Sequence, residues 1–137
     1  MRKSHYLKHR EAARALAKRR VEYFSPIYQV SVGRISIRNQ KTRWGSCSTR
    51  GNLNFNYKIA LIPEHLADYI IVHELCHLRE FNHSARFWDL VALTFPNHLE
   101  IRKELKQPVF VERIPQGHDL GFRLRVQEFL GLRFWQK

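Results

Sequence analysis

The pattern of the sequence predicts an α+β fold, in which helices flank a short antiparallel or mixed sheet. Three observations support this class. Apolar residues recur at helical spacing near the N-terminus, alternate with polar residues between positions 28 and 57, and return to helical spacing from position 63 onward. The chain has 137 residues, with no internal repeat and no low-complexity linker. We therefore expect residues 1–137 to form a single domain with its own core.

The first predicted element is a helix over residues 4–24. Apolar side chains occupy one of its faces, namely Ala13, Leu16, Ala17, Val21 and Phe24. Basic side chains fill the opposite face, which makes the helix amphipathic. Pro26 has no backbone N–H to donate, so we expect it to end the helix.

Strands are predicted in the next part of the chain. Residues 28–39 alternate apolar and polar side chains, and the alternation changes register at Gly33-Arg34, where either a two-residue turn or a bulge would fit. Residues 40–51 are rich in Gly, Ser and Thr and predict a loop. Residues 52–57 alternate again and predict a second, short strand.

Further helices are predicted over residues 63–80, 84–95 and 98–106. The first of them is apolar on nearly every side, which is typical of a buried helix. We expect Asn97 to cap the last one, with Glu100 as its reciprocal partner.

Basic residues dominate the charge, which is +12 for the whole chain. Residues 1–20 contain eight Lys or Arg side chains and one Glu. Such an excess either attracts nucleic acid, nucleotide phosphates or acidic protein, or keeps a solvated helix face soluble.

The cysteine content and the hydropathy predict a cytoplasmic protein that does not enter a membrane. The chain has only two cysteines, far fewer than disulfide-built secreted domains use, and we expect both to be reduced. No stretch approaches the ~20 apolar residues of a membrane-spanning helix. The basic N-terminus lacks the apolar run of a secretory signal.

The clearest chemical signal is the H-E-x-x-H motif that His73, Glu74 and His77 form on the predicted buried helix. Residues i and i+4 of a helix point the same way, so the two imidazoles can share one metal ion. Glu74 stands beside the first histidine, where its carboxylate can reach a water molecule on that metal. Burying two imidazoles and a carboxylate without such a partner would be costly.

A catalytic zinc site commonly has three protein ligands, and His83 is the leading candidate for the third. This choice requires the helix to end near Phe81-Asn82, because a straight helix would carry His83 too far along its axis. The H-E-x-x-H-x5-H spacing equals that of metzincins, but Glu80 stands where those enzymes have a glycine.

The rival third ligands are two downstream carboxylates, Glu100 and Glu104, and two other histidines, His98 and His118. We expect one Zn²⁺ per chain. Ni²⁺, Co²⁺ or Fe²⁺ could replace it in a purified sample, since all of them accept imidazole.

Several motifs occur in a characteristic order: Arg43-Trp44-Gly45-Ser46-Cys47-Ser48, Gly51, Asn56, Tyr69-Ile70-Ile71-Val72-His73-Glu74-Leu75-Cys76-His77-Leu78, Asn82-His83-Ser84 and Phe87-Trp88. In this order they resemble the YgjP-like metallopeptidase domain, which is related to SprT-type and WLM metalloproteases. The resemblance covers about residues 30–106. The basic helix at 4–24 and the tail at 107–137 carry no matching motif, and the tail is left unassigned.

The resemblance implies a small zincin-like fold, with a short sheet beside the active-site helix. It implies zinc on His73, His77 and His83, with Glu74 as the general base. It also implies that the Trp-Gly-Ser-Cys loop lies near the site. The candidate substrate-site residues are therefore Arg43, Trp44, Ser46, Cys47 and Asn56.

Several side chains near these motifs have more than one interpretation. Cys47 could be a fourth metal ligand, a redox-sensitive thiol or a packed small residue, whereas Cys76 should face the core. Arg43 could pair with a carboxylate or with a substrate anion. Asn54 and Asn56 could belong to a strand whose edge holds an extended substrate, or to a solvated face.

Three functions are compatible with these features. The first is a zinc-dependent peptidase that acts on a peptide or protein substrate, with Glu74 moving the proton of the attacking water. The second is a metal-dependent hydrolase of a nucleotide or another phosphate substrate, which the basic charge would suit although no P-loop is present. The third is a nucleic-acid-associated protease or binding protein, which the basic helix would suit.

Overall fold

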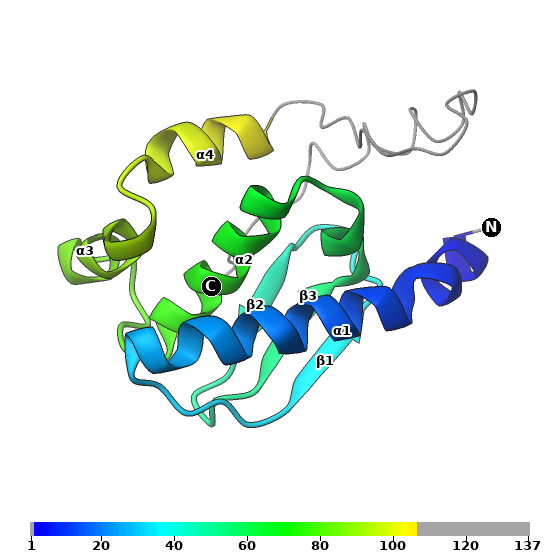
Figure 1. Ribbon diagram of the computed structural model, residues 1–137, viewed down its shortest axis with the longest axis horizontal. Helices are drawn as coiled ribbons and strands as arrows, with labels where there is room; N and C mark the ends of the chain where they lie inside the picture. The colour runs from blue at the N-terminus through cyan, green and yellow to red at the C-terminus, as the bar shows by residue number, and fades with distance from the viewer. Residues whose placement is uncertain (1, 107–137) are drawn as a thin grey trace.

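The computed structural model describes residues 2–106 (Figure 1). The expectations for the tail at 107–137 and for His118 lie outside the described residues. The elements in chain order are α1 (Arg2–Tyr28), β1 (Ile35–Arg38), β2 (Gly45–Cys47), β3 (Leu53–Asn56), the 3-10 helix η1 (Tyr57–Leu61), α2 (Glu64–His77), α3 (Ala85–Thr94) and α4 (His98–Leu105). The predicted α+β class is confirmed.

The sheet has three strands in the order β1-β3-β2. β1 runs parallel to β3, and β2 runs antiparallel to it. The register places Ile37, Phe55 and Gly45 in one row across the sheet, and all three residues are buried. The neighbouring row, Ser36, Asn54 and Ser46, is polar and half-buried, so the sheet has one core face and one polar face.

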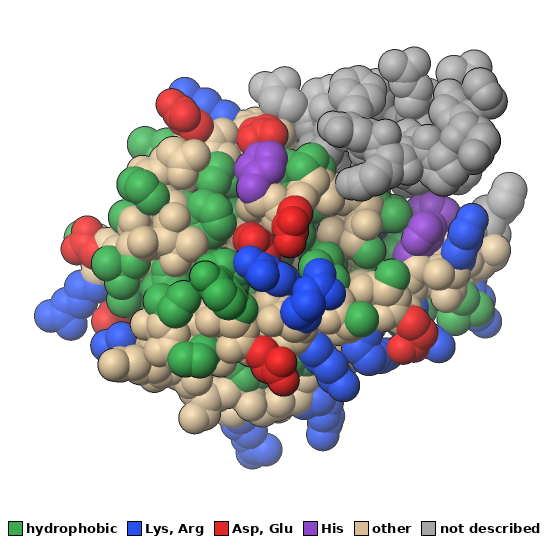
Figure 2. Space-filling view, in the orientation of Figure 1, with side chains coloured by type: hydrophobic (Ala, Val, Ile, Leu, Met, Phe, Trp, Pro, Cys, Tyr) green, Lys and Arg blue, Asp and Glu red, His purple; other side chains and the backbone are tan. Residues whose placement is uncertain are grey.

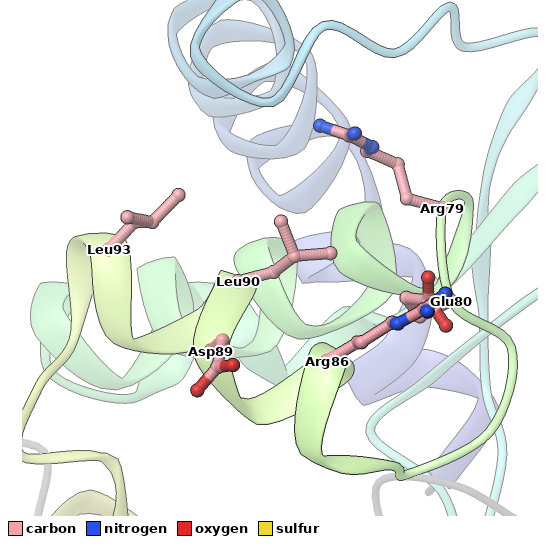
Figure 3. A pocket seen from close by; sticks show the side chains of 6 residues that line it. All are labelled: Arg79, Glu80, Arg86, Asp89, Leu90 and Leu93. Carbon is pink, nitrogen blue, oxygen red and sulfur yellow. The ribbon is translucent and has the colours of Figure 1, made fainter.

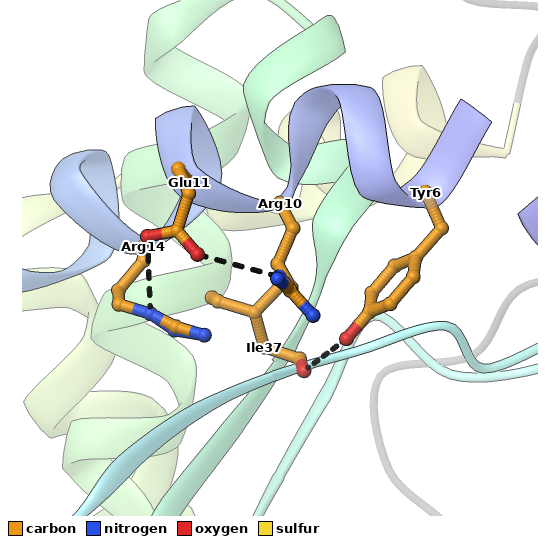
Figure 4. A network of polar contacts seen from close by, with 5 residues as sticks. All are labelled: Tyr6, Arg10, Glu11, Arg14 and Ile37. Atoms are coloured by element: carbon orange, nitrogen blue, oxygen red, sulfur yellow. Dashed lines mark hydrogen bonds and ion pairs between the residues drawn. The ribbon is translucent and has the colours of Figure 1, made fainter. Parts of the chain in front are cut away.

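Two long helices cover the sheet, α1 against β1 and α2 against β2. α1 lies along the β1 side of the sheet, where the hydroxyl of Tyr6 donates to the backbone oxygen of Ile37 at 3.2 Å (Figure 4). On the same stretch of helix, Glu11 forms ion pairs with Arg10 and Arg14. Part of the basic excess of the N-terminal segment is thereby compensated.

The helix α1 continues through Pro26, so the prediction that Pro26 ends it was wrong. The helix stops at Tyr28 because Gln29 adopts a left-handed conformation with φ of 55°. The N–H groups of Gln29 and Val30 then donate to the backbone oxygens of Pro26 and Ser25, both at 3.2 Å. This pair of bonds is the Schellman ending of a helix, and a proline in its last turn removes only one donor.

The strands differ from the prediction in two places. Only Ile35–Arg38 of the first predicted strand pairs with β3, and because this pairing is parallel, no two-residue turn forms at Gly33-Arg34. The segment expected to be a loop contains the three-residue strand β2. A turn closed by Gly51, with φ of 88°, joins β2 to β3.

The helix α2 ends at His77, three residues before the predicted end. The N–H group of Leu78 already bonds to the backbone oxygen of Leu75 at 3.0 Å, which tightens the last turn. Asn97 stands at the N-cap of α4, but its side chain makes no capping bond there, and the expected pairing with Glu100 is absent.

The charge distribution on the surface concerns the predicted nucleic-acid partner, and the helix composition concerns a membrane. On the face shown in Figure 2, Lys and Arg side chains are interspersed with Asp and Glu, and they do not form one continuous block. Among the described helices, none combines the length and the apolar content that crossing a bilayer requires.

Candidate metal centre and active site

The helix α2 presents His73 and His77 on one side, one turn apart. Their ring centroids are 4.9 Å apart, and the two residues are 2% and 0% exposed. Beyond its exposed first turn, most of the helix is buried, with apolar side chains that include Leu66, Ile70 and Leu75. The packing of the helix therefore holds both imidazoles in fixed positions.

The turn after α2 brings a third histidine back to the first two. The Nδ1 atom of His77 lies 3.0 Å from the backbone oxygen of Glu80, and its Nε2 atom lies 3.1 Å from Nε2 of His83. Ser84, directly after His83, caps α3 by accepting a hydrogen bond from the N–H group of Phe87. The early end of α2 and the start of α3 therefore position His83, which is exposed to solvent.

The three histidines are arranged so that they could hold one metal ion, and we refer to them as the metal-ligating set. One ring nitrogen from each lies within 4.8 Å of the others, and no other group of three or more such ligands occurs in residues 2–106. Two nitrogen ligands of a tetrahedral zinc ion are roughly 3.3 Å apart, so the His77–His83 separation fits a shared ion. A backbone acceptor at Nδ1 of His77 would hold the proton there and leave Nε2 for the metal.

The electrostatics keep these imidazoles neutral. Burial lowers the pKa of His77 to about 4. Burial, together with the neighbouring His77, His83 and Arg102, holds the pKa of His73 well below its usual value. Burial and the charge of Arg102 also lower the pKa of His83. Neutral imidazoles have the free lone pair that metal binding requires.

Two aromatic side chains of α3 set the orientation of the imidazoles. Phe87 stacks on His77, with ring centroids 4.4 Å apart and an angle of 24° between the planes. Trp88 stacks on His83 at 5.5 Å and 29°. The Phe87-Trp88 pair thus forms the α3 wall of the site.

Glu74 is fully buried against the strand β2. A Cβ atom at Gly45 would lie 3.2 Å from its Cγ atom and 3.3 Å from Oε2, so the absence of a side chain at position 45 makes room for the carboxyl group. Neither carboxyl oxygen has a hydrogen-bond partner among the described residues. Burial raises the pKa of Glu74 well above its usual value, and the Arg43 charge opposes this shift. Such an orphaned buried carboxyl group fits a site that supplies a water molecule or a metal.

Asn56 holds the loop that carries Gly45. Its Nδ2 atom donates to the backbone oxygens of Gln40 and Arg43, both at 2.9 Å, and its Oδ1 atom accepts from the N–H group of Lys58 at 3.0 Å. The side chain is 0% exposed. Asn56 therefore contacts the loop rather than the surface.

The other candidates from the loop occupy different environments. Trp44 is buried in the core. Ser46 lies on the polar face of the sheet, where its Oγ atom accepts from Asn54 at 3.3 Å. Cys47 is half-buried and outside the three-histidine set, and burial, with the charge of Glu74, raises the pKa of its thiol to about 12. Cys76 is fully buried in the core, as predicted.

The rival ligands are engaged elsewhere or lie apart from the set. Glu104 pairs with His65 at 3.0 Å. His98 stacks on Trp88, with ring centroids 4.9 Å apart. Glu100, the remaining described rival, does not join a ligand group within residues 2–106.

A pocket lies on the outer side of the α2–α3 turn (Figure 3). It is lined by Arg79, Glu80, Arg86, Asp89, Leu90 and Leu93. None of the three histidines contributes to it. Its connection with the metal-ligating set is Glu80, whose backbone oxygen contacts His77.

Sequence reasoning missed three contributors to the site: the contact of Gly45 with Glu74, the stacking of Phe87 on His77, and Arg102 beside Trp88. Gly45 and Phe87 carried a signal, since they belong to the Arg43–Ser48 and Phe87-Trp88 motifs, whereas Arg102 belongs to no motif.

An H-E-x-x-H helix packed on a small mixed sheet, with a third histidine within reach, defines the class of zincin-like metal-dependent hydrolases. The chain belongs to the YgjP-like metallopeptidase domain family, whose model matches residues 2–108. The matched range includes α1, which lies before the motifs of the predicted resemblance.

Two solved structures resemble the chain. The metallopeptidase zymogen abylysin of Pyrococcus abyssi is 27% identical, with a TM-score of 0.54, over 67% of this chain and 90% of that one. The metallopeptidase zymogen jannalysin of Methanocaldococcus jannaschii is 24% identical, also with a TM-score of 0.54, over 67% and 91%. No protein with a curated description matched the sequence. The family and the first of these structures support a metal-dependent hydrolase of the peptidase class.

Proposed function

We propose that this chain is a zinc metallopeptidase in which His73, His77 and His83 hold the metal and Glu74 is the general base. One observation carries the proposal: three neutral imidazoles converge to within 4.8 Å beside a buried carboxyl group without a hydrogen-bond partner in residues 2–106. A purely structural role would leave that carboxyl group buried at a cost of several kcal/mol.

When bound, zinc would polarise the scissile carbonyl and lower the pKa of a water molecule to about 7. Glu74 accepts a proton from the attacking water and delivers it to the leaving amine. Burial raises the pKa of Glu74, which makes its carboxylate a stronger base than an exposed one for accepting the proton of the water. The backbone oxygen of Glu80 orients His77, while Phe87 covers one face of the His77 ring and Trp88 one face of the His83 ring.

The strand order of the sheet makes β2, and not the strand with Asn54 and Asn56, the candidate edge for an extended substrate. Asn54 and Asn56 belong to β3, which is the central strand and cannot offer a free edge. β2 is the edge strand on the side of α2, and Gly45 places it directly against Glu74. A peptide added in extended form along β2 would pass the general base.

The test is peptide hydrolysis together with metal content, for the wild type and for Glu74→Gln. The variant should keep about one zinc ion per chain and lose roughly 10²–10⁴-fold in kcat, the range that general acid–base catalysis supplies. Glu80→Gln is the matched control and should retain activity, since the backbone of residue 80 contacts His77. Undiminished turnover by metal-loaded Glu74→Gln would remove the proposed role.

A nucleotide or other phosphate substrate is the second candidate. The charges of two arginines act on the site from different elements, Arg43 on Glu74 and Arg102 on His73 and His83. Both charges would favour a polyphosphate. Glu74-dependent release of phosphate or pyrophosphate from a nucleotide panel would support this substrate class over peptides.

A further inference from the structure

One indole ring connects α4 to the third histidine of the site. Trp88 of α3 stacks on His83, with ring centroids 5.5 Å apart. Two residues of α4, one turn apart, contact the same indole. His98 stacks on it at 4.9 Å and 18°, and the Cζ atom of Arg102 lies 4.5 Å from its ring centroid. Arg102 is therefore held beside the metal-ligating set by packing between helices.

The charge of Arg102 is not neutralised within the described part of the chain. The ion pairs found there join Arg10 and Arg14 to Glu11, Arg20 to Asp68, and His65 to Glu104. The Arg102 charge is nevertheless close enough to the set to contribute to the lowered pKa values of His73 and His83. A cation left uncompensated next to a dicationic metal site favours an anionic ligand.

The contact with Trp88 also leaves the hydrogen-bond donors of the guanidinium group available. The Cζ atom of Arg102 lies over the indole ring, a cation–π contact that uses none of the N–H donors. The guanidinium group carries these donors in a rigid planar fork. This fork matches the two oxygens of a carboxylate. An ion pair with a long side chain is normally weakened by the entropy lost when the side chain becomes fixed. Because the contact with Trp88 already restricts Arg102, less entropy is lost when Arg102 binds a carboxylate.

We infer that Arg102, held in place by Trp88, is a specificity-determining residue that binds a carboxylate of the substrate next to the reacting bond. The inference rests on the proposed peptidase function for the kind of substrate. The carboxylate can belong to an acidic side chain or to a free C-terminus, and the two sources are separated by experiment.

The experiment measures binding to the zinc-loaded, full-length Glu74→Gln protein, which should hold peptides without cleaving them. Three kinds of short fluorescent peptide are compared by anisotropy. The first has one Glu, placed at each position in turn, and an amidated C-terminus. The second has Gln in place of that Glu, and the third is the Gln peptide with a free C-terminus. Binding is repeated in Glu74→Gln/Arg102→Gln and in the matched control Glu74→Gln/Lys103→Gln, which removes the same charge from the exposed neighbouring position on α4.

We expect one of the two carboxylate-bearing peptides to bind roughly 10- to 100-fold more tightly than the amidated Gln peptide, which is the range of a charged hydrogen-bonded pair. This preference should vanish without Arg102 and persist without Lys103. The arm that shows the preference identifies the source of the carboxylate. If Arg102→Gln does not fold, Arg102→Lys keeps the charge but not the fork, and it should reduce the preference.

Three results would overturn the inference: no preference for any carboxylate, a preference that survives in the Arg102 variant, or an equal loss in the Lys103 control. Failure of the peptidase proposal gives a different pattern. In that case the zinc-loaded wild type cleaves none of the peptides, while the Arg102-dependent preference is still present in the binding measurement.

Discussion

The carboxyl group of Glu74 lies so close to Gly45 that a Cβ atom at position 45 would be 3.3 Å from Oε2 and 3.2 Å from Cγ. Carbon atoms in ordinary contact are about 3.5–4.0 Å apart. The same Cβ would also be 3.0 Å from the backbone oxygen of Asn54 on the central strand. The edge strand therefore limits where the proposed general base can stand.

Replacing Gly45 by alanine should displace Glu74 without removing it. We expect kcat to fall roughly 10- to 100-fold, since a small misplacement of a catalytic group is costly, while the zinc content stays near that of the wild type. The measurements are steady-state kinetics and elemental analysis. Gly33→Ala is the matched control, because its Cβ would meet Asn52 at 2.6 Å, away from Glu74. It should reduce stability and leave kcat unchanged. Equal kcat values for Gly45→Ala and the wild type would contradict the positioning role.

Removing His83 should abolish tight metal binding. His83→Ala leaves two imidazoles on one helix, and we expect most of the zinc to be lost during dialysis against a mild chelator. His98→Ala is the comparison, since His98 stacks on the same indole but lies outside the ligand set. It should keep about one zinc ion per chain. Full retention of zinc in His83→Ala would assign the third ligand to another residue.

Asn56→Ala should destabilise the protein and loosen the loop that carries Gly45. The substitution leaves two backbone oxygens and one N–H group of a buried region without their partner. We expect the free energy of unfolding to fall by about 2–4 kcal/mol in urea denaturation. Asn54→Ala, on the half-buried polar face of the same strand, should cost about 1 kcal/mol or less. A similar loss in both variants would mean that the loop is held by other contacts.

The thiol of Cys47 should be unreactive at neutral pH. Its pKa is raised to about 12, so the reactive thiolate forms in quantity only as the pH rises toward that value. At pH 8 we expect alkylation by iodoacetamide to be roughly 10³-fold slower than in the urea-unfolded chain, whose thiols ionise near pH 8.5. The native rate should keep rising with pH above 9, where the unfolded rate levels off. Peptide mass mapping separates Cys47 from Cys76, and a native plateau near pH 9 would favour the redox-thiol interpretation.

Local patterns were sufficient to predict that the helices exist and that two of the proposed ligands lie side by side. His73 and His77 are four residues apart on a helix that is apolar elsewhere, and helical geometry alone brings them together. The core positions of α1 and α2 followed from the same periodicity. Errors arose where a few backbone hydrogen bonds decided the outcome. α1 continues past Pro26 and ends in a Schellman motif at Tyr28, and Gly45–Cys47 forms a strand because it pairs with β3.

From the sequence we could predict the α+β class, the helix that carries His73, Glu74 and His77, and His83 as the leading candidate for the third ligand. These features depend on side chains close together in the chain, whose spacing is read through helical geometry. Three relationships depend on how the folded elements pack: Gly45 confines Glu74, Phe87 and Trp88 stack on the imidazoles, and Arg102 lies over Trp88. Those contacts join different secondary-structure elements. They form only when helices and strands pack, and periodicity contains no information about which distant side chains will meet.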